Sequence, residues 1–153
     1  MLRIQFPHYE ALRIHGEETY PHECCGVLLG KNEPGQDGPV NVVHQIVRAG
    51  NTRTDSAHNR YNIAPGELIK IQRQARGLGL DIVGFYHSHP DHPAMWSSTD
   101  IAEAHWLGCS YVITRVAQGK AEVTNSFLLL GTSEEDKSFA DEAIEIEIAE
   151  AVS

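Results

Sequence analysis

The sequence lacks long apolar runs, metal-type cysteine pairs and a secretion signal. None of its apolar stretches reaches the roughly 18 residues of a membrane-spanning helix, so no membrane contact is expected. The N-terminus has no long apolar segment followed by a cleavage site, which predicts a cytoplasmic protein. The three cysteines form no Cys-x-x-Cys pair and are expected to be reduced, as small buried hydrophobic residues.

Basic residues are also scarce, since 12 lysines and arginines stand against 21 acidic residues and give a net charge of −9. Eight of the acids lie between Glu134 and Glu150 with a single lysine, so the tail is acidic and the remainder nearly neutral. The absence of a basic stripe argues against nucleic acid as a partner. A hydrophobic content of 41% and a length of 153 residues suit one globular domain spanning residues 1–153.

Hydrophobic periodicity and turn residues divide the chain into helices and strands. Helices are expected over 7–19, 65–78 and 98–106. Strands are expected over 24–30, 40–47, 60–63, 81–86, 110–116 and 121–130, with a loop over 31–39. Isoleucine and glutamate alternate over 143–149, which favours an edge strand, with a helix from near Ser138 as the alternative. This order predicts an α/β fold with a mixed central β-sheet flanked by helices.

Two histidines and an aspartate follow the strand expected over 81–86. His87 and His89 alternate with a serine, so in a regular strand both imidazoles point to the same face. Asp100 lies in the first turn of the next expected helix and can add an oxygen ligand. Two histidines and a carboxylate, without cysteine, fit a catalytic zinc site that leaves a position open for water. A His-x-His pair alone is weak evidence for a metal, and the spacing to Ser97 and Asp100 strengthens it.

A hydrolytic metal site also needs a base that takes a proton from the attacking water. Glu23, directly before the strand expected over 24–30, is the candidate. The alternative is a solvated surface carboxylate, which is the commoner environment of a glutamate. The pair His22-Glu23 does not begin a His-Glu-x-x-His motif, because position 26 is a glycine.

The combination of Glu23, His87-Ser88-His89-Pro90, Ser97 and Asp100 resembles the JAMM motif of the MPN metallopeptidase family, in its compact prokaryotic form. The resemblance implies a cytidine-deaminase-like architecture and one Zn²⁺ ion per chain, bound by the two histidines and Asp100. It also implies that Glu23 acts on a zinc-bound water as general base and then as general acid.

Two other residues of the motif stretch can be interpreted. The resemblance implies that Ser97 donates a hydrogen bond to the oxyanion of the tetrahedral intermediate. Its alternative role is a helix cap, which Ser98 or Thr99 could provide instead. His92 lies outside the motif spacing and is expected to be exposed and not to bind the metal.

Three residues are predicted to contact the substrate. Arg60 and Tyr61 resemble a family segment beside the catalytic groove, and an exposed arginine and a packed tyrosine are the ordinary alternatives. Ser88 is the third predicted substrate contact. Its alternatives are a residue that orients the two histidines and an ordinary strand hydroxyl.

The resemblance implies a zinc metallopeptidase or isopeptidase that cuts an amide bond at the C-terminal tail of a ubiquitin-like protein or its conjugate. For a chain this short, a sulfur-carrier protein of that type is the expected substrate. Two alternatives stay open, namely a non-catalytic MPN interaction module and a zinc hydrolase of a small amide. The oligomeric state, and whether the bond is a peptide or an isopeptide bond, stay open as well.

Overall fold

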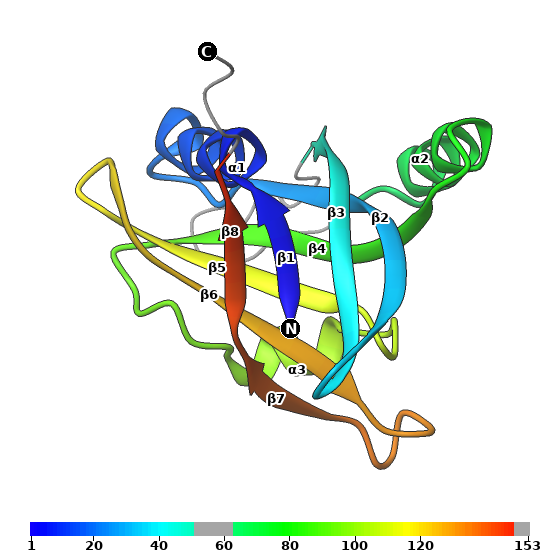
Figure 1. Ribbon diagram of the computed structural model, residues 1–153. Helices are drawn as coiled ribbons and strands as arrows, with labels where there is room; N and C mark the ends of the chain where they lie inside the picture. The colour runs from blue at the N-terminus through cyan, green and yellow to red at the C-terminus, as the bar shows by residue number, and fades with distance from the viewer. Residues whose placement is uncertain (51–62, 149–153) are drawn as a thin grey trace.

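The computed structural model describes residues 1–50 and 63–148, which contain three helices and a single eight-stranded sheet (Figure 1). The helices are α1 (Phe6–Thr19), α2 (Pro65–Gly77) and α3 (Ser98–Glu103). The strands are β1 (Leu2–Gln5), β2 (Cys25–Gly35), β3 (Gly38–Ala49), β4 (Asp81–Pro90), β5 (Ser110–Ala117), β6 (Lys120–Leu130), β7 (Ser138–Glu142) and β8 (Ile144–Glu147). None of these helices is both long and apolar enough to cross a membrane.

The sheet is mixed and has the strand order β7-β6-β5-β4-β2-β3-β1-β8. β4 runs antiparallel to β2 and parallel to β5, and the connection from β4 to β5 passes through α3. The two edge strands, β7 and β8, are separated in sequence only by Ala143, so the sheet curls until its edges meet (Figure 1). At this junction the backbone N–H of Leu2 donates to the carbonyl oxygen of Ala143 over 2.9 Å.

Helices pack on both faces of the curled sheet, and the two larger apolar clusters lie beneath them. Leu12 of α1 packs with Leu28 and Tyr86 on one face. Ile71 of α2 packs with Val27 and other strand residues on the opposite face, where α3 also lies. Neighbouring residues of β2 therefore face different helices, as the alternation of side chains along a strand requires. The predicted α/β class, with a mixed sheet flanked by helices, is confirmed.

Several element boundaries differ from the sequence predictions. The predicted loop 31–39 is mostly the continuation of β2 and β3 as a long hairpin. The helix expected over 98–106 ends at Glu103. The strand expected over 81–86 continues to Pro90 because β5 keeps pairing with it. Of the expected strand 60–63, residues 60–62 lie outside the described part of the chain.

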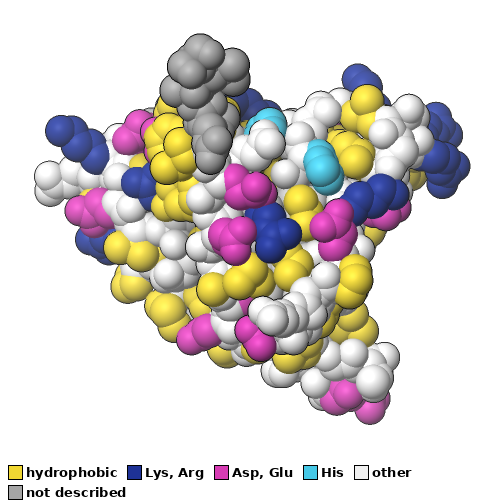
Figure 2. Space-filling model, in the orientation of Figure 1, with side chains coloured by type: hydrophobic (Ala, Val, Ile, Leu, Met, Phe, Trp, Pro, Cys, Tyr) yellow, Lys and Arg dark blue, Asp and Glu magenta, His cyan; other side chains and the backbone are white. Residues whose placement is uncertain are grey.

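The tail is extended, as the alternating isoleucines and glutamates predict. Residues Ile144–Glu147 form β8, which pairs in parallel with β1. The alternative helix from Ser138 is wrong, because Ser138–Glu142 is the edge strand β7. All three cysteines are free thiols and buried, as expected. On the surface, acidic and apolar side chains are spread over the face shown in Figure 2, and lysine and arginine gather mainly over α2 and the left-hand edge.

Candidate metal centre

The two histidines of the motif lie on β4, where both neighbouring strands fix the backbone. His87 pairs with Cys25 of β2 on one side and with Ile113 of β5 on the other. His89, two residues later, is held by β5 alone. As expected for alternate strand residues, both imidazoles point to the same side, and their Nε2 atoms lie 3.2 Å apart.

Asp100 reaches these imidazoles from the first turn of α3. Its Oδ1 lies 3.2 Å from Nε2 of His87, and its Oδ2 lies 3.2 Å from Nε2 of His89. A capping box orients the carboxylate, since Oδ2 also accepts from the backbone N–H of Ser97 over 2.7 Å. The cap that starts α3 therefore also aims Asp100 at the histidines.

The separations and the chemistry of the three side chains suit a zinc ion. In a tetrahedral site with metal–ligand bonds of about 2.1 Å, ligand atoms lie about 3.4 Å apart. The two Nε2 atoms lie 3.2 Å apart, and each lies 3.2 Å from a different carboxylate oxygen of Asp100. Nδ1 of His89 lies 2.8 Å from the carbonyl oxygen of Pro93, which can only accept. A proton therefore sits on Nδ1, and a metal would bind Nε2 in place of the proton that Nε2 shares with Asp100 when no metal is bound.

The charges of the three groups follow from their burial and contacts. Burial lowers the pKa of His87, which keeps this imidazole neutral. Burial also lowers the pKa of His89, but hydrogen bonds with Asp100 and the Pro93 carbonyl outweigh it and raise the pKa overall. Despite burial, the hydrogen bonds from both histidines hold the pKa of Asp100 well below its usual range, so it is an anion. The neutral imidazole and the carboxylate are the forms in which these side chains bind metals.

Glu23 approaches the same site from the segment before β2. It is only 3% exposed, so the surface alternative is wrong. One carboxylate oxygen and a nitrogen from each imidazole lie within 4.8 Å of one another. Glu23 could therefore also be counted among the ligands, but the shorter 3.2 Å separations favour Asp100 as the third. Burial raises the pKa of Glu23 to about 8, the direction that suits a group exchanging protons near neutral pH.

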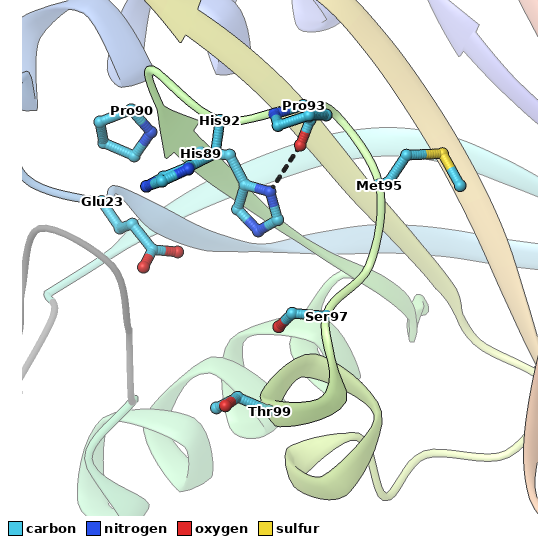
Figure 3. Close-up of a pocket in the computed structure, with 8 residues that line it drawn as sticks. All are labelled: Glu23, His89, Pro90, His92, Pro93, Met95, Ser97 and Thr99. Atoms are coloured by element: carbon cyan, nitrogen blue, oxygen red, sulfur yellow. Dashed lines mark hydrogen bonds between the residues drawn. The ribbon is translucent and has the colours of Figure 1, made fainter.

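Ser97 lines a pocket of about 380 Å³ together with Glu23 and His89 (Figure 3). It is the N-cap of α3, and its Oγ accepts from the backbone N–H of Asp100 over 3.1 Å. The expectation that Ser98 or Thr99 provides the cap is therefore wrong. A hydroxyl that accepts through a lone pair still has its hydrogen to donate, so capping and hydrogen-bond donation into the pocket are compatible.

The remaining predicted residues have different outcomes. Ser88 is fully buried, and its Oγ accepts from the backbone N–H of Cys24 over 2.9 Å. A side chain without exposed surface cannot touch a substrate, so the predicted substrate contact is wrong, and an orienting residue or an ordinary strand hydroxyl are the alternatives left for Ser88. Arg60 and Tyr61 lie outside the described residues. His92 is exposed, as predicted, and it lines the pocket, with its backbone N–H donating to the carbonyl oxygen of His89 over 3.4 Å.

Sequence reasoning missed three contributors to the pocket. They are the carbonyl of Pro93, which orients His89, and the side chains of Met95 and Thr99 (Figure 3). The carbonyl is a backbone group and leaves no side-chain signal, while the two side chains belong to residue types common in any loop. Only their place between the histidines and Asp100 in the sequence could have suggested them.

Residues 6–129 match the family described as prokaryotic homologs of the JAB domain, and the chain belongs to this family. The match confirms the family resemblance of the motif. It also extends the likeness to most of the chain, from the start of α1 to the end of β6.

Among curated proteins, the chain is similar to the desampylase of Haloferax volcanii, with 35% identity over 95 residues, 61% of this chain and 62% of that protein. It is also similar to the probable TtuB-protein conjugate cleaving protease of Thermus thermophilus, with 32% identity over 63% of this chain and 59% of that protein. A third relative is the CysO-cysteine peptidase of Mycobacterium tuberculosis, with 29% identity over 67% of this chain and 65% of that protein. The similarity thus spans about three fifths of the length of these relatives.

Solved structures share the fold over nearly the whole chain. A protein of Desulfitobacterium hafniense superposes with a TM-score of 0.75 at 25% identity and covers 99% of this chain and 95% of its own. A protein of Salinibacter ruber gives a TM-score of 0.69 at 36% identity and covers 95% of this chain and 91% of its own.

Proposed function

We propose that the chain, taken as one domain over residues 1–153, is a zinc-dependent peptidase or isopeptidase acting on the C-terminus of a ubiquitin-like protein. The observation that carries this proposal is the triangle of His87, His89 and Asp100, with ligand atoms 3.2 Å apart and the carboxylate of Glu23 beside it. A buried carboxylate beside a set of metal-binding side chains can take a proton from a metal-activated water. This suits hydrolysis, and not only the binding of a ligand. The names of the similar proteins, two of them peptidases or proteases, support the same reaction class.

Each residue of the site has a separate role in amide hydrolysis. A Zn²⁺ ion held by His87, His89 and Asp100 would polarise the scissile carbonyl and lower the pKa of water. Glu23 accepts a proton from the attacking water while the water oxygen bonds to the carbonyl carbon. Ser97 Oγ–H donates to the carbonyl oxygen as negative charge develops there. Glu23 then gives the proton to the leaving nitrogen as the carbon–nitrogen bond breaks, which yields an amine and a carboxylic acid that loses its proton to the amine or to solvent.

The first test is the variant Glu23→Gln, which keeps the shape of the side chain but cannot take a proton. Loss of general acid–base catalysis should reduce kcat by about 10²–10⁴-fold. Zinc content, measured by elemental analysis, should stay at one ion per chain, and Glu33→Gln on the exposed β2–β3 hairpin is the matched control. Undiminished turnover in Glu23→Gln would refute the mechanism. A wild-type protein that hydrolyses amides equally well after chelation would refute the role of zinc.

The substrate test uses the molecules named in the similar proteins. A TtuB–protein conjugate and a CysO–cysteine adduct are incubated with the chain, and the products are read by mass spectrometry. Hydrolysis should leave the intact ubiquitin-like protein and a free amine. Arg60 and Tyr61 remain proposed substrate contacts, and Arg60→Ala should then raise KM more than it lowers kcat. Hydrolysis only of small amides would favour the alternative of a small-amide hydrolase.

A further inference from the structure

A hydrogen bond between Tyr20 and Asp91 links the two segments that supply the base and the second histidine. The hydroxyl of Tyr20 donates to Oδ2 of Asp91 over 2.6 Å. Tyr20 is three residues before Glu23, and Asp91 is two residues after His89. Neither side chain lines the metal pocket, and no role follows for either from the motif.

The segment that carries Glu23 has no regular secondary structure of its own. α1 ends at Thr19 and β2 begins at Cys25, so Glu23 lies in the irregular connection between this helix and this strand. On its C-terminal side the connection is tied to β4, because the N–H of Cys24 donates to Oγ of Ser88 and the N–H of Ser88 donates to the carbonyl of Cys24. On its N-terminal side, the hydroxyl of Tyr20 links the connection to Asp91, the residue directly after β4.

Asp91, the acceptor of this hydrogen bond, is fixed in place by two further hydrogen bonds. The backbone N–H of Asp91 donates to the carbonyl of Val116 over 2.8 Å, and its Oδ1 accepts from the N–H of Gln118 over 2.8 Å. Both partners belong to β5 and the turn that follows it. Asp91 has φ of 57°, in the left-handed region that aspartate tolerates better than most residues. The ring of Tyr20 lies close to Gly119 of the same turn.

We propose that Tyr20 and Asp91 form a clamp that sets the position of Glu23 relative to His89, and that both are positioning residues for hydrolysis. This inference rests on the proposed function. The two hydrogen-bonded links to the Glu23 segment end at Ser88 of β4 and at Asp91, directly after β4, so they lie on either side of His89 and hold the base and the ligand in one unit. Tyr20 is half-buried and Asp91 is exposed, so the clamp is not part of the apolar core. Its contribution is therefore expected in the placement of Glu23 more than in folding.

The kinetic test compares Tyr20→Phe, Asp91→Ala and the double variant on whichever TtuB or CysO substrate the wild type hydrolyses. Misplacement of the base should lower kcat by about tenfold in each single variant, with KM within about twofold of wild type. Because both changes break the same bond, the double variant should match Asp91→Ala rather than multiply the two losses. Tyr9→Phe on α1 is the matched control, since the Tyr9 hydroxyl makes no hydrogen bond among the described residues.

A second measurement does not depend on activity. In the metal-free protein, hydrogen–deuterium exchange of the segment 20–24 should be faster in Tyr20→Phe than in wild type, and unchanged in Tyr9→Phe. Unchanged exchange, multiplicative losses in the double variant, or a rate loss confined to KM would each overturn the clamp. If the wild type cleaves none of the substrates, the proposed function fails, and the exchange data alone decide whether Tyr20 fixes the Glu23 segment.

Discussion

Ser97 combines an observed role, capping α3, with a proposed role in catalysis, and the two would use different parts of one hydroxyl group. Its oxygen caps α3 by accepting from the backbone N–H of Asp100, while its hydrogen remains available to a developing oxyanion. Sequence spacing identified Ser97 but left the cap open between it and its neighbours, because Ser97, Ser98 and Thr99 are all residue types that cap helices. Only the geometry shows that the cap and the proposed donor are one residue.

The two tasks can be separated by substituting Ser97 with alanine and with glycine. Both variants remove the donor and should lower kcat by about 10²–10³-fold. Alanine also removes the cap and should cost about 1 kcal/mol of unfolding free energy, whereas glycine at an N-cap costs only a few tenths of a kcal/mol. Steady-state kinetics and urea unfolding measure the two effects. A kcat loss that follows the stability loss across the two variants would show that Ser97 acts only as a cap.

α3 is the weakest element around the site and depends on contacts at its two ends. It has six residues, and none of them is fully buried. The capping box holds its N-terminal end, and Lys137 holds its C-terminal end. The side chain of Lys137 is only 9% exposed, and its Nζ donates to the carbonyl of Ala104 over 2.9 Å and to that of Ala102 over 3.3 Å.

Replacing Lys137 with methionine keeps the aliphatic part of the side chain and removes the donor. The carbonyls at the end of α3 lose their partner, so the unfolding free energy of the metal-free protein should fall by about 1–3 kcal/mol. Because Asp100 is on α3, zinc affinity measured by competition with a chelator should fall as well. The exposed Lys120→Met variant is the control. Zinc affinity equal to wild type in Lys137→Met would show that α3 is positioned by its N-terminal cap alone.

Helices and strands whose bounds follow from the local sequence pattern were predicted well. Those whose bounds depend on contacts with distant parts of the chain were not. The proline at position 65 and the helical spacing after it identified α2. By contrast, the end of α3 depends on Lys137, which is more than thirty residues further along the chain. β4 continues through Pro90 because β5 pairs with it, although a proline near the end of an apolar run suggests a stop. β1 is too short for its periodicity to be recognised, and it is a strand because β3 and β8 flank it.

At the scale of the whole molecule, the sequence predicted a mixed sheet flanked by helices, but neither the strands β1 and β7 nor the closure of the sheet. The junction of β7 and β8 at opposite edges depends on pairing between the two ends of the chain, which no local pattern encodes. The proposed site residues were easier to recognise than the closure of the sheet, because their residue types and spacing can be read directly from the sequence. The structure adds that Glu23 is buried, and burial changes its protonation.

The free energy of unfolding should therefore depend on pH through Glu23 when no metal is bound. Burial raises the pKa of Glu23 to about 8, above its ordinary value of 4.5 in an unfolded chain. Between these two values the folded protein holds a proton that the unfolded chain releases. The contribution of Glu23 is thus fully present below about pH 4.5 and is lost as the pH rises through 8, at about 1.4 kcal/mol for each unit of pKa shift and a few kcal/mol at most.

Urea unfolding of chelator-treated wild type and Glu23→Gln at pH 4.5 and pH 8.5 measures this dependence. Glutamine does not titrate, so Glu23→Gln should gain stability relative to wild type between the two pH values, while the other titrating groups act in both proteins and largely cancel. The comparison must be made without metal, because a cation next to Glu23 favours its charged form and reduces the difference. Parallel pH profiles for the two proteins would mean that Glu23 is already ionised in the folded metal-free state, and that burial does not hold its proton.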